Sequence, residues 1–371
     1  MPTADERFTL TEIQSEGVRW INDDKIGLTR TGGAGPSDHK ALNFNSQTLM
    51  IPVFNEQACQ SPYEAQTLPG GQQAAIFREG IEIAKVDLPA RPKFYECSTQ
   101  DGVPYWKIAT LHSKDVLATT VLQECIRYRK RSTSCQFCAI EESLKTGRTI
   151  AHKSPQQLAE VAQAAVELDG VTQMVMTTGT PRTSDRGAEV LCESAAAVTA
   201  RVDLPIQAQC EPPRDDVWFQ RLQDSGVVSL GMHLEAVSEP IRKKIMPGKA
   251  SVSLSRYMEA FARAVEVFGK GQVSTYILAG LGDSEQQIVA MGERLIQMGV
   301  YPFVVPFVPI AGTPLENHPM PDPDMMHRIL SKLGILLVKN NLVSEQIKAG
   351  CAKCGACSSL KSYEENAYAR L

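Results

Sequence analysis

The length, composition and charge of the chain set broad limits on its fold and partners. The chain has 371 residues, of which 43% are hydrophobic and 22% charged. These values are typical of a globular protein with room for one α/β barrel or two to three smaller domains. The formal net charge of −4 gives no sign of a nucleic-acid or membrane partner. No apolar run approaches the about 18 residues of a spanning helix, and residues 1–7 lack a secretory signal, so we expect a cytoplasmic location.

Residues 1–104 are expected to form a small appendage that is mixed α/β or β-rich. They contain two apolar runs, at 48–54 and 74–86, and a glycine-rich run from Gly32 to Pro36 that leads into Asp38 and His39. Glycine permits a close backbone approach, so the run could contact a substrate. It lacks the Gly-Lys-Ser/Thr ending of a phosphate-binding loop. An ordinary loop is therefore the favoured interpretation.

Residues 105–340 alternate short apolar runs with amphipathic stretches. Strands are predicted at 116–123, 171–178, 204–210, 227–234, 273–279 and 301–308, and helices at 155–168, 187–201, 216–224, 253–268, 284–298 and 322–339. Strands that are each followed by a helix imply a parallel sheet with right-handed crossovers. We therefore expect an α/β fold with a partial (β/α)6 TIM-like barrel, or an open doubly wound sheet as the alternative. Either fold places the active site at the C-terminal ends of the strands.

Three cysteines follow the first predicted strand of this barrel. Nine residues separate Cys125 from Cys135, and Cys138 completes a Cys-x2-Cys pair. Grouped thiols in a reducing compartment indicate metal or redox ligands before they indicate disulfides. Three thiolates can hold three irons of a four-iron cluster and leave the fourth iron open to a cosubstrate. A structural zinc site and unrelated buried cysteines are the alternatives.

A second group of three cysteines lies in the predicted tail, residues 341–371. Cys351, Cys354 and Cys357 have the spacing Cys-x2-Cys-x2-Cys. This spacing favours an auxiliary iron–sulfur cluster, with zinc as the alternative. The candidates for a further ligand are Cys59, Cys97, Ser358 and Ser359. Three residues that flank the first barrel strand are candidates for surface positions, namely Lys107, His112 and Lys114.

The first cysteine group and the strand ends that follow it resemble the radical S-adenosylmethionine (radical SAM) superfamily. Cys135-Gln-Phe-Cys138 matches the second half of the usual signature, Cys-x3-Cys-x-aromatic-Cys, whereas the spacing from Cys125 is longer. Later segments are also similar to this superfamily and to its lipoyl and biotin synthases, namely 177–180, 233–237, 241–248, 280–284 and 308–316. The resemblance covers about residues 105–340.

The resemblance implies a cofactor set and a reaction class. The cysteines at 125, 135 and 138 would hold a [4Fe–4S] cluster that binds SAM and cleaves it to a 5′-deoxyadenosyl radical, which abstracts hydrogen from a small-molecule substrate. An electron donor such as flavodoxin or ferredoxin is implied, and a homodimer is one option. The residues expected near SAM are Thr177, Thr178, Gly179 and Glu235, with Arg242, Lys243 or Lys244 at its carboxylate and Gly280 and Gly282 near its adenine.

Almost the whole chain resembles one group within the superfamily, the biotin-synthase-related proteins encoded beside bacterial nitrilases. The resemblance depends on the glycine-rich run, residues 101–105 and 114–120, the long cysteine spacing and the cysteines of the tail. Similarities to biotin and lipoyl synthases favour sulfur insertion. The alternative within the class is radical rearrangement or carbon–carbon chemistry with a non-sacrificial auxiliary cluster. The alternative outside it is a zinc-stabilised barrel that binds a ligand.

Overall fold

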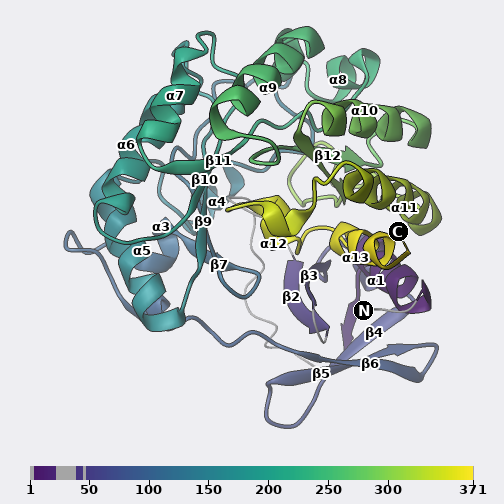
Figure 1. The fold of residues 1–371 in the computed structure, drawn as a ribbon. Helices are drawn as coiled ribbons and strands as arrows, with labels where there is room; N and C mark the ends of the chain where they lie inside the picture. The colour runs from purple at the N-terminus through teal and green to yellow at the C-terminus, as the bar shows by residue number, and fades with distance from the viewer. Residues whose placement is uncertain (1–3, 22–38, 45–46, 371) are drawn as a thin grey trace.

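Two β-sheets organise the protein, which is described by a computed structural model covering residues 4–21, 39–44 and 47–370. A six-stranded sheet has the order β1-β4-β5-β6-β2-β3, and a seven-stranded sheet has the order β13-β12-β11-β10-β9-β8-β7. Figure 1 shows the larger sheet curled inside a layer of helices, with the smaller sheet beside it. The glycine-rich run at 32–36 lies outside the described residues.

The smaller sheet is mixed and carries its own core. Its strands are β1 (Arg19–Ile21), β2 (His39–Phe44), β3 (Gln47–Pro52), β4 (Tyr63–Thr67), β5 (Gln73–Arg78) and β6 (Ile81–Asp87). Two helices accompany it, α1 (Ala4–Glu16) and α2 (Glu56–Cys59). Ile13 of α1 packs with Leu49 and Ile51 of β3 in a buried apolar cluster. The expected α/β character of the N-terminal part is confirmed.

The larger sheet is a partial barrel of strand–helix units. Its strands are β7 (Thr110–His112), β8 (Val116–Thr120), β9 (Gln173–Thr177), β10 (Ile206–Gln209), β11 (Val227–Gly231), β12 (Val273–Ala279) and β13 (Val300–Pro306). The helices that follow β8 to β13 are α5 (Pro155–Asp169), α6 (Ala188–Thr199), α7 (Val217–Asp224), α9 (Leu254–Phe268), α10 (Glu285–Gln297) and α11 (Pro323–Lys339). Strands β8 to β13 pair in parallel, which confirms the predicted barrel units.

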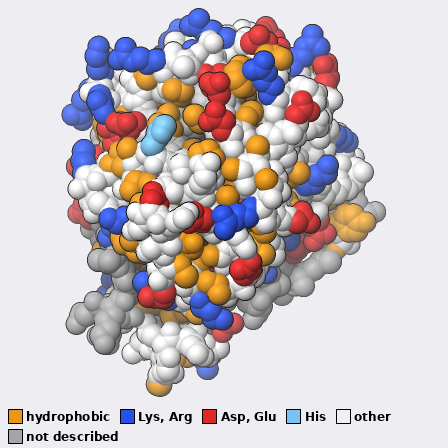
Figure 2. All heavy atoms as spheres, turned by 90° about the vertical axis from the view of Figure 1, so that its left-hand side faces the viewer, with side chains coloured by type: hydrophobic (Ala, Val, Ile, Leu, Met, Phe, Trp, Pro, Cys, Tyr) orange, Lys and Arg blue, Asp and Glu red, His pale blue; other side chains and the backbone are white. Residues whose placement is uncertain are grey.

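Short elements complete the described chain. They are the helices α3 (Tyr105–Ile108), α4 (Glu142–Lys145), α8 (Glu239–Ile245), α12 (Cys351–Cys354) and α13 (Leu360–Arg370), and the 3-10 turns Lys93–Glu96, Lys249–Ser251 and Ser344–Gln346. No described helix has the length and apolar content that would let it span a bilayer. Figure 2 shows acidic and basic side chains interspersed over one face of the molecule.

Helix starts in the barrel are fixed by local capping. Ser154 and Gln157 form a reciprocal capping box at the start of α5, and Ser284 and Gln287 form one at the start of α10. Each box satisfies backbone N–H groups that have no partner within the first helical turn. The predicted helix starts at these two places therefore have a direct physical cause.

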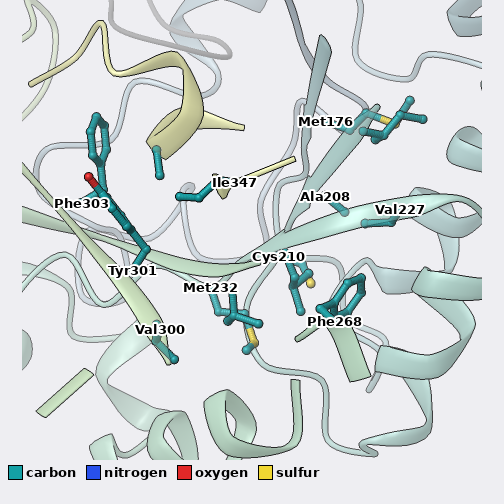
Figure 3. Close-up of a cluster of buried hydrophobic side chains, with 14 of the residues drawn as sticks. Met176, Ala208, Cys210, Val227, Met232, Phe268, Val300, Tyr301, Phe303 and Ile347 are labelled. Carbon is teal, nitrogen blue, oxygen red and sulfur yellow. The ribbon is translucent and has the colours of Figure 1, made fainter. Parts of the chain in front are cut away.

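The two faces of the barrel strands differ sharply in polarity. Side chains on the outer face, such as Ile206 and Ala208 of β10, pack against the helices in the main hydrophobic core. Cys210 lies in this core with Met232 and Phe268 (Figure 3). The alternate residue Gln207 is fully buried, and its side-chain amide donates to Ser274 Oγ of β12 at 3.1 Å. Because successive strand residues point to opposite faces, these polar side chains line the barrel interior.

The polar inner residues near the starts of the strands hold the tail. Ser229 Oγ of β11 donates to Ala349 O at 2.7 Å, and Gly350 N donates to Gln173 Oε1 of β9 at 2.6 Å. Gly350 has a φ of +108°, and an added Cβ would lie 2.1 Å from the Gln207 side chain. Only glycine fits this position without displacement. The tail thus crosses the N-terminal end of the barrel, and α13 continues alongside α11 and α1 (Figure 1).

Candidate active site

A cavity of about 380 Å³ lies inside the partial barrel and is lined by both cysteine groups. Cys138 lines it from the loop after β8, and Cys351 and Cys357 line it from the tail. The rest of the wall comes mainly from β8, β9, β12 and β13, with His39 and Met50 contributed by the smaller sheet. Two groups of thiols that are more than 200 positions apart in sequence therefore meet at one chamber.

Backbone contacts fix the loop that carries the first cysteine group. Gln136 N donates to Ile245 O at 2.8 Å, and Gly248 N donates to Thr133 O at 3.1 Å. An added Cβ on Gly248 would lie 2.3 Å from Thr133 O. The end of α8 and the residues after it therefore hydrogen-bond the backbone of the cysteine loop directly. Gly248 makes the closest approach, to Thr133, and a side chain there would collide with the loop.

The turn after β9 supports the same loop from the other side. Gly179 N donates to Leu122 O at 2.8 Å, and an added Cβ on Gly179 would lie 2.1 Å from Glu124 O. The residue next to Glu124 is Cys125. Gly179, predicted as a SAM contact, is thus packed against the backbone that positions the first cysteine.

Burial changes the acidity of the first cysteine group. Desolvation raises the pKa of Cys138 to about 12. Desolvation, with the Glu235 carboxylate as the next cause, raises the pKa of Cys135 well above its usual value. Because iron binds thiolates, these thiols must lose protons when a metal group is bound. Within the described ranges, no three His, Cys, Asp or Glu side chains converge as ligands of a single metal ion.

A buried ion pair borders the first cysteine group. Lys249 Nζ lies 2.7 Å from Glu235 Oε2, and the two side chains are 10% and 16% exposed. Burial is the largest single cause and lowers the pKa of Lys249, but Glu235 together with Tyr257, Cys135 and Glu211 raises it above its usual value, so Lys249 remains charged. The positive charge of Lys249 lowers the pKa of Cys135 and so offsets part of the rise that burial causes. A positive charge of this kind is expected beside a thiolate ligand. Sequence reasoning missed Lys249, although it directly follows Gly248 in a segment that resembles lipoyl synthases.

A second buried pair lies near the same strand ends. Arg127 Nη1 is 2.9 Å from Glu211 Oε1, and both side chains are 8% exposed. Thr180 Oγ1 donates to the same Glu211 oxygen at 2.8 Å. Arg127 belongs to the basic stretch between Cys125 and Cys135. This residue is therefore fixed inside the protein and is not part of a solvated basic surface.

The other residues predicted near SAM divide into two sets. Thr177 and Glu235 line the cavity. Arg242 and Lys244 are not among the lining residues: Lys244 is exposed, and the buried Arg242 donates to Leu234 O at 3.1 Å and Val252 O at 2.9 Å. A role of these two residues at the SAM carboxylate remains a prediction, and the structure gives Arg242 a clear packing role.

The predicted adenine-side glycines form a tight turn after β12. Gly280 and Gly282 have φ values of +107° and +120°. An added Cβ on Gly282 would lie 2.8 Å from Ile241 of α8. Both residues therefore supply the positive φ that the turn requires and that glycine adopts without strain. Their place near the SAM adenine remains a prediction. Thr178 Oγ1 donates to Gly179 O at 2.9 Å and takes part in the equivalent turn after β9.

His233 is a residue of the cavity wall that sequence reasoning did not single out. Its Nδ1 accepts a hydrogen bond from Tyr276 N–H at 3.2 Å. Burial, with Lys249 as a second cause, lowers the pKa of His233 to about 3, so the ring is neutral and its proton lies on Nε2. Nε2 is buried without a hydrogen-bond partner among the described residues. A strand-end histidine two positions before Glu235 is the signal that could have revealed it.

Polar side chains surround the second cysteine group. Gln209 Nε2 donates to Cys351 Sγ at 3.1 Å, and the Tyr276 side chain hydrogen-bonds both Cys351 and Cys357. His112 Nε2 lies 3.5 Å from Cys357 Sγ. Hydrogen-bond donors of this kind stabilise thiolate sulfur and tune iron–sulfur groups. The expected surface position of His112 is wrong, because only 6% of the residue is exposed.

The other candidate ligands predicted from sequence are placed elsewhere. Ser358 Oγ donates to Val304 O at 2.6 Å, and Ser359 Oγ lies 2.9 Å from Thr11 Oγ1. Cys59 is exposed at the end of α2, and neither Cys59 nor Cys97 lines the cavity. The structure therefore places His112 beside Cys357 and leaves the two serines in other hydrogen bonds.

Comparison with known proteins identifies the barrel. Residues 131–295 match the family model of the radical SAM superfamily. Over these residues the chain is similar to radical SAM enzymes. Such enzymes use a [4Fe–4S] cluster and SAM, and they require a reductant and a small-molecule substrate. The buried thiols of the first group, with a lysine beside them, are a chemically suitable donor set for that cluster.

Similar proteins cover much of the chain at low identity. Bacteriochlorophyllide c C-7(1)-hydroxylase of Chlorobaculum limnaeum is 26% identical over 357 residues, which are 91% of this chain and 86% of the relative. A solved methylornithine synthase is 16% identical over 67% of this chain and 68% of its own, with a TM-score of 0.47. A radical SAM methyltransferase from Sphaerobacter thermophilus is 14% identical over 80% of this chain and 81% of its own, with a TM-score of 0.46.

Proposed function

We propose that this radical SAM enzyme abstracts hydrogen from a largely apolar small molecule bound between its two cysteine groups. The single observation that carries the proposal is that Cys138, Cys351 and Cys357 line the same cavity. Cys125, Cys135 and Cys138 would hold a [4Fe–4S] cluster, which when reduced would supply the one electron needed to cleave SAM to methionine and a 5′-deoxyadenosyl radical. Hydrogen transfer from the substrate then gives 5′-deoxyadenosine and a substrate radical. Flavodoxin or ferredoxin is the proposed source of the electron.

The cavity wall supports an uncharged, mainly apolar substrate. Phe137, Ile140, Leu278, Val305 and Phe307 are among the apolar side chains that line it. The carboxylate on the wall, Glu235, is already paired with Lys249. A charged substrate group would therefore lose hydration without gaining a partner of opposite charge.

A hydrogen-bond acceptor on the substrate would complete the bonding of His233. The Nε2–H group is buried and has no partner among the described residues, and such groups gain free energy when they are satisfied. Its neutral state above about pH 3 means that it acts as a fixed donor in the physiological range. We assign His233 to positioning of the substrate.

The reaction that we favour is sulfur insertion at the carbon that loses hydrogen. The tail cysteines would hold an auxiliary iron–sulfur cluster at the cavity wall, and the resemblance to biotin-synthase-related proteins encoded beside nitrilases supports this choice. Hydroxylation is the second candidate, because the relative aligned over 91% of this chain is a hydroxylase. Radical rearrangement or carbon–carbon chemistry is the remaining alternative. The same proposal divides the chain into an appendage (1–104), a barrel (105–340) and a cluster-bearing tail (341–371).

The proposal is tested with anaerobically purified and reconstituted protein. Dithionite and SAM should yield 5′-deoxyadenosine from the unaltered protein and none above background from Cys138→Ala. Protein that contains zinc without iron and forms no 5′-deoxyadenosine would support the zinc-stabilised barrel and overturn the proposal.

The substrate is sought as a small-molecule fraction that raises the yield of 5′-deoxyadenosine. His233→Gln should reduce this stimulation, whereas the matched control His152→Gln, at an exposed position, should not. The mass of the product then separates a gain of sulfur from a gain of oxygen. A product of unchanged mass would favour rearrangement.

A further inference from the structure

A buried imidazole lies beside the second cysteine group. His112 ends β7, lines the cavity and is 6% exposed. Its Nε2 atom lies 3.5 Å from Cys357 Sγ. Imidazole nitrogen binds iron in some iron–sulfur clusters as well as single metal ions. A histidine beside a cysteine group that is proposed to hold a cluster is therefore a candidate ligand.

The fold brings this imidazole to the tail through a dedicated hairpin. Strand β7 is the antiparallel member of an otherwise parallel sheet, and His112 pairs with Val116 of β8. The next residue, Ser113, has a φ of +58°, and its hydroxyl hydrogen-bonds the Cys354 thiol. One tight turn therefore reaches two of the three tail cysteines.

We infer that His112 is the fourth protein ligand of an auxiliary iron–sulfur cluster held by Cys351, Cys354 and Cys357. The inference depends on the proposed function for the presence of a second cluster. It goes beyond that function by naming the protein ligand of the fourth iron, which the three thiolates leave without one. The two serines that could serve this purpose donate or share hydrogen bonds with Val304 and Thr11 instead.

The donor set has two chemical consequences. A neutral imidazole carries one negative charge less than a fourth thiolate, which raises the reduction potential of a cluster. Hydrogen bonds from Gln209 and Tyr276 to the cysteine sulfurs act in the same direction. Four protein ligands also leave no open iron, so the substrate would meet this cluster through its sulfides or through electron transfer and not by coordination.

The test isolates the second site before it examines the ligand. The triple variant Cys125→Ala/Cys135→Ala/Cys138→Ala removes the first site and leaves the tail intact. After anaerobic reconstitution, its iron and sulfide contents and its reduced electron paramagnetic resonance signal report the auxiliary cluster alone. Protein labelled with ¹⁵N-histidine should show a directly coordinated nitrogen by pulsed hyperfine spectroscopy.

A ligand replacement then assigns the nitrogen to His112. In the triple background, His112→Cys should keep the iron content, lose the strong nitrogen coupling and lower the midpoint potential. His112→Ala should reduce the iron content because it removes a ligand without replacing it. The matched control His152→Cys, at an exposed position, should retain the coupling and the potential. Thermal unfolding of each variant confirms that it is folded.

The outcomes separate two kinds of failure. If the triple variant binds no cluster, both the auxiliary cluster and the role of His112 are overturned, while SAM cleavage at the first site stands. If the cluster forms but shows only weak nitrogen coupling, His112 is a hydrogen-bond donor to sulfur and the ligand inference is wrong. If strong nitrogen coupling persists in His112→Cys, the coordinated nitrogen belongs to another residue and the ligand inference is also wrong.

Discussion

The two cysteine groups lie at opposite ends of one cavity and are held by different kinds of contact. Backbone groups hold the first loop, as in the bonds from Gln136 N to Ile245 O and from Gly248 N to Thr133 O. Strand side chains hold the tail, as in the contacts of Ser229 and Gln173 with residues 349 and 350. The division is one of balance, because the Arg127–Glu211 pair also fixes the first loop and a backbone bond from Met50 N to Ala356 O also holds the tail.

The largest expected effect separates the chemistry of the two groups. Cys138→Ala should reduce 5′-deoxyadenosine formation by more than the about 10–100-fold typical of changes outside the ligand shell. Cys357→Ala should retain SAM cleavage but lose formation of the substrate-derived product. High-performance liquid chromatography measures both compounds, and an iron assay counts the loss from each site. Equal loss of SAM cleavage in the two variants would contradict the division of roles.

A glycine substitution tests how the tail is seated. Gly350→Ala places a Cβ against Gln207 at a positive φ, so it combines overpacking with backbone strain and should lower the free energy of unfolding by about 2–5 kcal/mol. The matched control is Gly269→Ala, which has a φ of +92° but open space around it, and it should cost about 1–2 kcal/mol. Denaturant unfolding of iron-free protein gives both values. Equal costs would show that the contact with Gln207 is unimportant.

The buried ion pair tests the support of the first cysteine group. Lys249→Met leaves the Glu235 carboxylate without its partner and should cost about 3–5 kcal/mol. The double variant Lys249→Met/Glu235→Gln removes both charges and should recover most of that loss. The double-mutant cycle is measured by denaturant unfolding, and strict additivity of the single costs would argue against coupling.

The same pair has a defined dependence on pH. The folded-state pKa of Lys249 is raised, so its stabilisation is fully present below the unfolded value near 10.5 and is lost as the pH rises through the folded value. We therefore expect the cost of Lys249→Met to be constant between about pH 7 and 9. A cost that declines over this range would contradict the assignment of a charged lysine.

The smallest expected effect concerns a serine near the second group. Ser358→Ala removes the hydrogen bond to Val304 O and should lower the free energy of unfolding by about 1–3 kcal/mol. Its iron content should remain that of the unaltered protein, because His112 and not Ser358 is the proposed ligand. Ser362→Ala, which loses a buried bond to Ser359 O, is a matched control. Loss of iron in Ser358→Ala alone would restore the serine as a ligand.

Sequence reasoning anticipated the barrel because its signals are local. Strand–helix alternation and capping residues such as Ser154 and Ser284 act within a few positions of the elements they define. The strand predicted at 273–279 has those bounds in β12, whereas β11 ends earlier than predicted because a side chain replaces strand pairing. Leu234 N, for example, donates to Thr275 Oγ1, and β11 has already ended at Gly231.

The second site was not accessible from sequence for a different reason. Strand β7 has three residues, which is too short for a periodic signal, and the polar face of β10 lies inside the barrel only because the sheet curls. Cysteine spacing indicates ligands but not their location in the fold. The partners of residues 349–351, on β9, β10 and β11, lie more than 100 positions earlier in the chain. Only tertiary closure brings these groups together.

The contact between α1 and the tail has a consequence for biosynthesis. Thr11 Oγ1 hydrogen-bonds Ser359 Oγ and the Tyr363 hydroxyl across separations of 348 and 352 positions. During translation, all barrel strands therefore leave the ribosome before the residues that close the floor of the chamber. Until then Ser229, Gln173 and Gln207 lack the hydrogen bonds that they make with residues 349–351 in the complete fold.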